Sequence, residues 1–243
     1  MLKIIDISSW QADIILGNVL PNIDGCIVKA TEADSYTNPY CNKWIAELEK
    51  AGKPFGFYHF AQPFSDAASQ AEYFIRNCKG YFGNGIPVLD WEVPINDRWV
   101  NTFVNIVHSE TGIWPWIYGN AWRFDSGTVE KNCARWIAAY PDVANPTFEQ
   151  ASKWEVPECD GAVAAWQFCS DGRVKGYHGD LDCSLFYGDL KAWNKYAGKT
   201  TKPKKRVTQL SNTAYSITVT DKGIGKAKQV LEDKNYKITI ERK

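Results

Sequence analysis

Short apolar stretches recur along residues 1–193, and nearly every one ends in a polar or functional side chain. Segments whose apolar residues have helical spacing separate the first few of these apolar stretches. Such strand and helix alternation predicts a parallel sheet with covering helices. Because the stretches number eight, closure into a barrel is expected. The predicted strands are Lys3–Ser8, Gly25–Ala30, Phe55–Phe60, Pro87–Glu92, Trp114–Gly119, Ala134–Tyr140, Ala164–Phe168 and Asp180–Phe186.

The predicted helices are fewer than a regular eightfold repeat would supply. Ser65-Asp66 is a suitable N-cap for one of them, and Gly112 is a suitable stop for another. Beyond Tyr140 the helical pattern fades, and residues 141–157 are expected to form a loop with one short helix. The predicted helices span residues 38–51, Ser65–Cys78, Asp97 to about Glu110, and Asn120–Cys133.

The polar strand ends indicate a functional site, because α/β barrels build their sites at the C-terminal ends of the strands. Convergence of seven strands on one rim is hard to explain by solvation alone. The polar groups concerned are Asp6 and Ser8, Lys29 with Thr31-Glu32, Tyr58 with His59, Asp90 and Glu92, Tyr118, Gln167, and Asp182.

The most informative strand end is Pro87-Val88-Leu89-Asp90-Trp91-Glu92. Side chains alternate along a strand, so Asp90 and Glu92 share one face while Trp91 points away. Two carboxylates aimed into one space are what acid/base chemistry on a sugar bond requires. The alternative is a pair of solvated charges where a strand meets a loop, and the polar ends of the other strands favour the site.

Composition narrows the functional class. Eleven Trp and twelve Tyr suit either a core of large side chains or a groove that stacks on sugar rings. No apolar run is long enough to span a membrane, so membrane insertion is not expected. The seven cysteines show no Cys-x-x-Cys spacing, and His59, His108 and His178 lack zinc-ligand spacing. We therefore expect free thiols, mostly in the core, and neither a metal nor a cofactor.

Charge divides the chain near residue 198. Residues 199–243 carry 12 Lys or Arg against 4 Asp or Glu, whereas residues 1–198 carry the remaining 16 and 24. We expect a barrel domain over residues 1–196, a basic linker over 197–206 and a small module over 207–243. That module alternates as strand, helix, strand, and it is too small to be stable alone. It is expected to dock on the barrel, to self-associate into a homo-oligomer, or to bind a partner.

An ordered set of motifs across residues 3–190 resembles glycoside hydrolase family 25, the Chalaropsis-type lysozymes found in many phage endolysins. The resemblance implies a flattened, irregular TIM-like barrel with eight strands and about five helices. It also implies cleavage of the β-1,4 bond between N-acetylmuramic acid and N-acetylglucosamine in peptidoglycan. The matching stretches are Ile5–Ser8, Ile27–Glu32, Gly56–Phe60, Pro87–Glu92, Ile117-Tyr118, Trp136–Tyr140, Trp166–Phe168 and Gly179–Asp182.

The resemblance also implies roles for individual residues. Glu92 matches the general acid, Asp90 its partner on the same strand, and Asp6 and Asp182 match carboxylates that line the same pocket. An ionised Asp90 and partial burial would both raise the pKa of Glu92. The 2-acetamido group of the substrate is a candidate nucleophile, with Asp90 or Asp182 orienting it. The candidate substrate-binding residues are Lys29, Tyr58, His59, Tyr118, Trp166 and Gln167.

Several of these residues also suit an alternative role. Asp6 could pair with Lys29 or Arg173, and Asp182 could cap a turn after Gly179. His59 is expected to support the site by hydrogen bonding rather than to act as a base. Trp10, Trp122 and Trp166 suit sugar platforms and core packing equally well.

The sequence thus predicts a peptidoglycan muramidase, most simply an endolysin. With no secretory signal visible, it is expected to be made in the host cytoplasm and to act on the wall after release. The basic tail suits an anionic wall polymer better than a nucleic acid, because only Tyr215 and Tyr236 interrupt it with aromatic rings. The competing functions are a chitinase-like glycosidase and a catalytically silent glycan-binding module.

Overall fold

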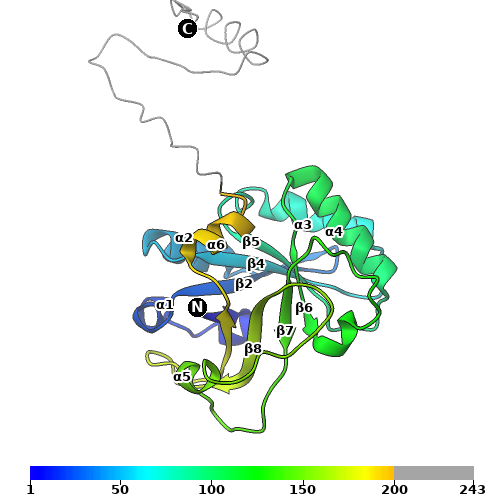
Figure 1. Ribbon diagram of the computed structural model, residues 1–243. Coiled ribbons are helices and arrows are strands. Elements are labelled where there is room, and N and C mark those ends of the chain that lie inside the picture. The colour runs from blue at the N-terminus through cyan, green and yellow to red at the C-terminus, as the bar shows by residue number, and fades with distance from the viewer. Residues whose placement is uncertain (200–243) are drawn as a thin grey trace, which may run out of the picture. The chain divides into compact units, whose positions relative to one another are not determined.

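Eight strands close into a barrel in the computed structural model, which describes residues 1–199 (Figure 1). Each strand pairs with the next around the ring, and parallel pairing of the first with the second completes it. A two-residue strand, β3 (Tyr36–Thr37), pairs antiparallel with the end of β2. The predicted irregular barrel is confirmed. Its strands are β1 (Leu2–Ile7), β2 (Gly25–Glu32), β4 (Phe55–Phe60), β5 (Ile86–Asp90), β6 (Trp116–Asn120), β7 (Arg135–Ala138), β8 (Val163–Gly172) and β9 (Leu181–Phe186).

The last strand runs opposite to the others. β9 pairs antiparallel with both β8 and β1, and Asp182 lies directly opposite Asp6. The eight residues between β8 and β9 are too few for a parallel crossover, which needs about a dozen or more. The expectation of an all-parallel sheet was therefore wrong for β9. Asp182 reaches the same rim as the other polar groups because it lies near the start of its strand, not at its end.

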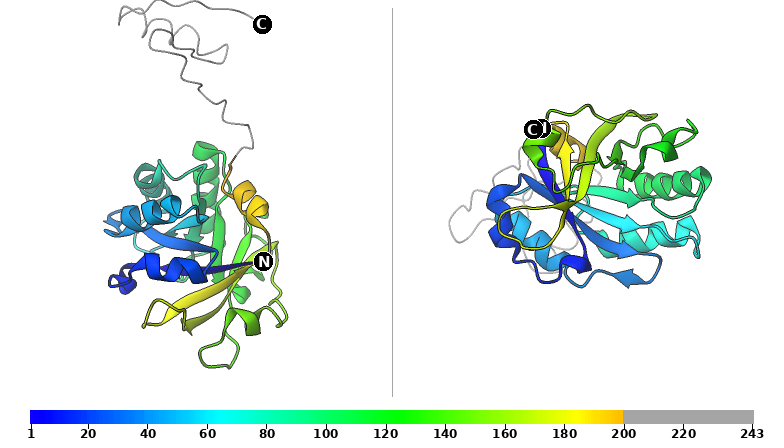
Figure 2. Two further views of the ribbon diagram at one scale, coloured as in Figure 1. Left: turned by 90° about the vertical axis from the view of Figure 1, so that its left-hand side faces the viewer. Right: turned by 90° about the horizontal axis from the view of Figure 1, so that it is seen from below.

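Six α-helices accompany the strands in residues 1–199. The three longest pack outside the barrel, and α3 and α4 lie side by side (Figures 1 and 2). After β6 the helices shrink to short pieces, in agreement with the fading helical pattern. The helices are α1 (Leu16–Val19), α2 (Cys41–Lys50), α3 (Ala67–Cys78), α4 (Asp97–Thr111), α5 (Phe148–Ala151) and α6 (Leu190–Tyr196).

Helix ends follow the capping residues in the sequence. The Asp66 side chain accepts a hydrogen bond from the Ser69 amide at the start of α3, at 2.9 Å. At the end of α4, Gly112 adopts a left-handed conformation with φ of 73°, which glycine tolerates without strain. Both predicted boundaries are confirmed.

The helix predicted over Asn120–Cys133 was wrong. Only a 3-10 turn, η3 (Ala121–Phe124), forms there, and Gly127 at φ of 69° turns the chain. The fully buried Arg135 guanidinium replaces helical hydrogen bonding by donating to the carbonyl oxygens of Val129, Glu130 and Cys133. The end of the segment is an irregular loop whose carbonyl groups are satisfied by a nearby side chain instead of by helical hydrogen bonds.

Side-chain alternation gives the barrel an apolar interior below a polar rim. Inward-facing apolar residues include Ile4, Ile27, Val88 and Trp116. α6 closes the end opposite that rim. Its Trp193 is fully buried, lies 5.6 Å from the Trp116 ring centre, and donates from Nε1 to a carbonyl at the start of β4.

All seven cysteines are free thiols, as expected, and six of them are buried. None of the helices in residues 1–199 is long and apolar enough to cross a membrane. The described residues 1–199 belong to one unit, and Ala197 is still buried within it. The rest of the predicted linker and the predicted module over 207–243 lie outside the described residues.

Replacing Trp193 with alanine tests whether α6 is an integral part of the barrel. We expect the Trp193→Ala variant to lose about 3–5 kcal/mol of unfolding free energy, because a large aromatic core side chain is removed. Urea denaturation measures the change. Trp10, which is 89% exposed, supplies the control, and Trp10→Ala should change the stability by no more than about 0.5 kcal/mol. Equal effects of the two substitutions would contradict this role of α6.

Candidate active site

Four carboxyl groups gather at the polar rim. Asp6 comes from β1 and Asp182 from β9, and the two are register partners. Asp90 is the last residue of β5, while Glu92 lies two residues beyond it in the loop before α4. The charge of Glu92 raises the pKa values of Asp6, Asp90 and Asp182, so the structure brings all four predicted carboxylates together.

Asp6 and Asp182 hold their protons unusually strongly. Burial raises the pKa of Asp6 well above its usual range, and the charge of Asp182 raises it further. Burial also raises the pKa of Asp182 to about 7, with a contribution from Glu92. Lys29 pairs with Glu32 at 2.6 Å, so the alternative of an Asp6–Lys29 ion pair is not realised. Arg173 pairs with Asp180 instead of Asp6, at 2.7 Å.

Asp90 and Glu92 differ in their surroundings. Asp90 is buried, and its Oδ1 has no hydrogen-bond partner. Burial raises its pKa well above the usual range, followed by the charge of Glu92. Glu92 is exposed at the rim, yet desolvation of its carboxyl raises its pKa. The expectation of a raised Glu92 pKa is confirmed. The expected contribution of Asp90 was wrong in sign, because a hydrogen bond from Asp90 lowers the pKa of Glu92.

Gln167 is hydrogen-bonded to three other residues of the rim. Its Nε2 donates to Asp6 Oδ2 at 2.9 Å, while its Oε1 accepts the hydroxyl of Tyr118 at 2.7 Å. The hydroxyl of Tyr140, just after β7, donates to the same Oε1. These bonds fix the amide so that its NH2 group points to the carboxylate. Tyr140 was not predicted as a site residue, although it shares the inward face of Trp136 and Ala138 by alternation.

Lys29 and Tyr58 also border the carboxyl cluster. The two residues are register partners on β2 and β4. Lys29 lies with its Nζ 4.7 Å from the Phe60 ring centre, and its positive charge lowers the pKa values of Asp90 and Glu92. Burial raises the pKa of the Tyr58 phenol, and the charge of Asp90 adds to this. Lys29 and Tyr58 are therefore close enough to the carboxyl cluster to interact with its charges.

His59 and Trp166 lie outside the barrel wall. His59 is fully buried against Phe103 of α4, and its Nδ1 and Nε2 are hydrogen-bonded to Thr31 and Gln70. Burial lowers its pKa to about 4. Trp166 is 3% exposed and donates from Nε1 to the Ala139 carbonyl. The structure does not bring either residue to the carboxyl cluster, because each alternates with an inward-facing neighbour.

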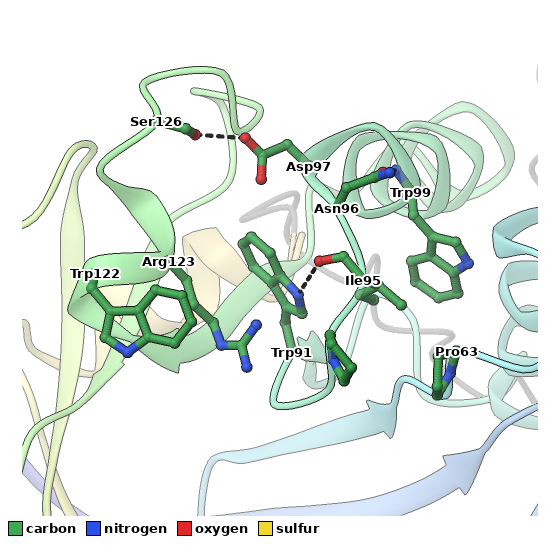
Figure 3. Close-up of a pocket in the computed structure, with 10 residues that line it drawn as sticks. Pro63, Trp91, Ile95, Asn96, Asp97, Trp99, Trp122, Arg123 and Ser126 are labelled. Carbon is green, nitrogen blue, oxygen red and sulfur yellow. Dashed lines mark hydrogen bonds between the residues drawn. The ribbon is translucent and has the colours of Figure 1, made fainter.

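Arg123 supports the Glu92 loop and was not predicted from the sequence. Its Nη2 donates to the Glu92 carbonyl at 2.6 Å, and its Nη1 to the Val93 carbonyl at 3.1 Å. The guanidinium also stacks over Trp91 and Trp122 (Figure 3). Its positive charge lowers the pKa of Glu92. No local pattern could reveal the hydrogen bonds, because they join residues 30 or more positions apart.

The chemistry of the rim is that of proton transfer next to a buried negative charge. One exposed carboxyl with a raised pKa can donate a proton, while the buried carboxyls can stabilise a developing positive charge. Within residues 1–199, no three His, Cys, Asp or Glu side chains are placed to hold a metal ion together.

The family model of glycosyl hydrolases family 25 matches residues 5–177, and the chain belongs to this family. It is therefore a glycoside hydrolase. An N,O-diacetylmuramidase from Chalaropsis sp is 33% identical over 147 residues, which cover 52% of this chain and 70% of the relative.

Solved structures agree with this assignment. The bacterial lysozyme from Streptomyces coelicolor has a TM-score of 0.67 and 27% identity, over 81% of this chain and 97% of that one. The CTP1L endolysin has a TM-score of 0.61 and 26% identity, over 80% of this chain and 70% of that one. The chain thus resembles lysozymes in both sequence and fold.

Replacing Asp182 with asparagine should stabilise the protein at neutral pH. Folded Asp182 keeps its proton to about pH 7, whereas an unfolded aspartate loses it near pH 4, so this carboxyl makes stability fall as pH rises between those values. The advantage of Asp182→Asn should grow from about pH 4 to about pH 7, reaching about 2–4 kcal/mol, and then level off. Urea denaturation across this range measures it. A stability difference that does not change with pH would contradict the raised pKa.

Proposed function

We propose that the chain is a muramidase that cleaves the β-1,4 bond between N-acetylmuramic acid and N-acetylglucosamine in peptidoglycan. The observation that carries the proposal is the cluster of Asp6, Asp90, Glu92 and Asp182 at one rim, with one exposed carboxyl above three more enclosed ones. Membership of family 25 and the likeness to a diacetylmuramidase support the substrate.

Glu92 is proposed as the general acid. Its carboxyl is accessible at the rim, and desolvation raises its pKa towards the pH at which proton donation is effective. Asp90 is buried and therefore less accessible than Glu92. Glu92 would protonate the leaving oxygen and, once ionised, accept a proton from water.

Asp6, Asp90 and Asp182 are proposed to position the reacting sugar and to stabilise its positive charge. The substrate's 2-acetamido group can attack the anomeric carbon, with Asp90 or Asp182 orienting its N–H. The unpartnered Oδ1 of Asp90 supports this role, because a buried acceptor without a donor favours one from the ligand. Gln167, which accepts the Tyr118 hydroxyl, donates to Asp6, and Lys29 and Tyr58 complete the pocket wall.

Two other functions deserve a test. A chitinase-like glycosidase would use the same carboxyls on a different sugar. A silent glycan-binding module would need no acid, yet all four acidic positions are occupied and their pKa values are perturbed in the manner of a working site.

The biological setting is proposed to be host lysis. The likeness to the CTP1L endolysin supports an enzyme made in the host cytoplasm that acts on the cell wall after release. The net positive charge of residues 199–243 supports a contact with anionic wall polymer, and self-association through residues 207–243 is the competing role.

Replacing Glu92 with glutamine should abolish lysis. Glutamine keeps the shape of the side chain but cannot donate the proton, so we expect kcat to fall by at least about a hundredfold with unchanged thermal stability. Turbidity loss of purified cell walls measures lysis. The matched control is Asp180→Asn, an exposed carboxylate paired with Arg173, which should keep wild-type activity. Retained activity in Glu92→Gln would overturn the assignment of the acid.

Mass spectrometry of the digested wall separates the candidate reactions. Muramic acid at the new reducing end would support a muramidase, whereas N-acetylglucosamine there would exclude it. Hydrolysis of chitin at an equal rate would favour the chitinase-like alternative.

The Arg123 contacts predict a pH effect. A general acid works while protonated, so activity falls as pH rises through its pKa. Because the charge of Arg123 lowers the pKa of Glu92, Arg123→Met should move the alkaline limb of the pH–rate profile to higher pH. Arg123→Lys keeps the charge and should leave that limb in place. Both variants lose the paired guanidinium hydrogen bonds to the carbonyls of Glu92 and Val93, so kcat should fall by about tenfold or more.

If Arg123 acts only on stability, the alkaline limbs of Arg123→Met and Arg123→Lys will coincide. That result, measured with soluble glycan strands over a range of pH, would show that Arg123 has no electrostatic effect on the acid.

A further inference from the structure

A groove of about 690 Å³ lies beside the Glu92 loop, outside the barrel wall. Figure 3 shows its lining, with Trp122 and Arg123 on one side, Trp91 between, and Trp99 and Pro63 on the other. The lining comes from the segments that follow β4, β5 and β6. The groove therefore opens on the same face as the carboxyl cluster.

One loop forms a wall of both the carboxyl pocket and the groove. Residues 91–96 connect β5 to α4, with the Glu92 carboxyl near Asp90 and the Trp91 ring turned the other way into the groove. A hydrogen bond from Trp91 Nε1 to the Ile95 carbonyl, at 3.1 Å, fixes this loop. Arg123 braces it from the groove side. A chain that leaves the pocket past Glu92 would enter the groove.

The charged groups of the groove are partly engaged by neighbouring parts of the protein. The Arg123 guanidinium donates to two backbone carbonyls, and the Asp97 carboxylate accepts the hydroxyls of Ser126 and Thr128. These contacts hold both groups in place, although the buried Arg123 Nε has no partner and both hydroxyls bond the same Asp97 oxygen, Oδ2. Trp122, by contrast, is 64% exposed. Aromatic faces with neutral polar groups around them suit a sugar ring better than an acidic peptide.

We propose that this groove binds the leaving-group side of the glycan strand through its sugar rings. The inference rests on the proposed function, because the general acid must lie beside the leaving oxygen. With the reacting sugar held over Asp6 and Asp182, the leaving group begins at Glu92 and continues over the loop towards Trp122. Trp122 is then a binding residue for long substrates and not a catalytic one.

The test compares three substrates: glycan strands freed of stem peptides, intact peptide-bearing strands, and an aryl glycoside of the wall disaccharide. The aryl leaving group is a single ring that is too short to follow the groove. We expect Trp122→Ala to lower the ratio of kcat/KM for peptide-free strands over that for the aryl glycoside by about fivefold to tenfold. Trp122→Phe, which keeps an aromatic face, should restore most of the ratio. Leu190→Ala removes an exposed apolar side chain of α6, at the opposite end of the barrel, and should leave the ratio unchanged.

An unchanged ratio in Trp122→Ala would overturn the proposal. A fall confined to the peptide-bearing strands would overturn it as well, because the occupant would then be the stem peptide. Wild-type hydrolysis of the strands tests the proposed function separately. Hydrolysis together with an unchanged ratio rejects the groove alone, whereas strands that stay intact with the wild-type enzyme reject the muramidase function itself.

Discussion

The site depends on the way β9 closes the barrel. By running antiparallel between β8 and β1, β9 places Asp182 directly opposite Asp6, where two carboxyls share a poorly hydrated space. Asp90 completes the buried group from the other side of the ring. Such a cluster costs stability when ionised, and the covered apolar interior below must compensate for it. The raised pKa values of the three aspartates are the sign of that cost.

Most of the fold could be predicted because strand patterns are local. All eight barrel strands overlap their predicted ranges, and the caps at Asp66 and Gly112 marked their helix ends correctly. The residues of β9 do not indicate its direction. The short connection after β8 does, because eight residues are too few for a parallel crossover. Residues 120–133 were misassigned because the buried Arg135, rather than a helix, satisfies that backbone.

The carboxyl cluster could be predicted in the same way, since each member sits next to an apolar stretch. Two substrate-binding predictions ignored alternation: Tyr58 faces inward, so His59 faces outward, and Gln167 and Trp166 differ in the same manner. Applying the two-residue alternation of strand side chains to both strands would have placed His59 and Trp166 outside the barrel. Arg123 carries no comparable pattern, because its role comes from contacts with a loop about 30 residues earlier in the chain.

The central claim is that burial and mutual repulsion raise the pKa values of the clustered aspartates. Carbon-13 NMR titration of the aspartate carboxyls, assigned with single Asp→Asn variants, measures this directly. The account predicts that Asp6 and Asp90 titrate well above the usual range and that Asp182 titrates at about pH 7. Titration of all three near pH 4, the value of an ordinary aspartate, would contradict it.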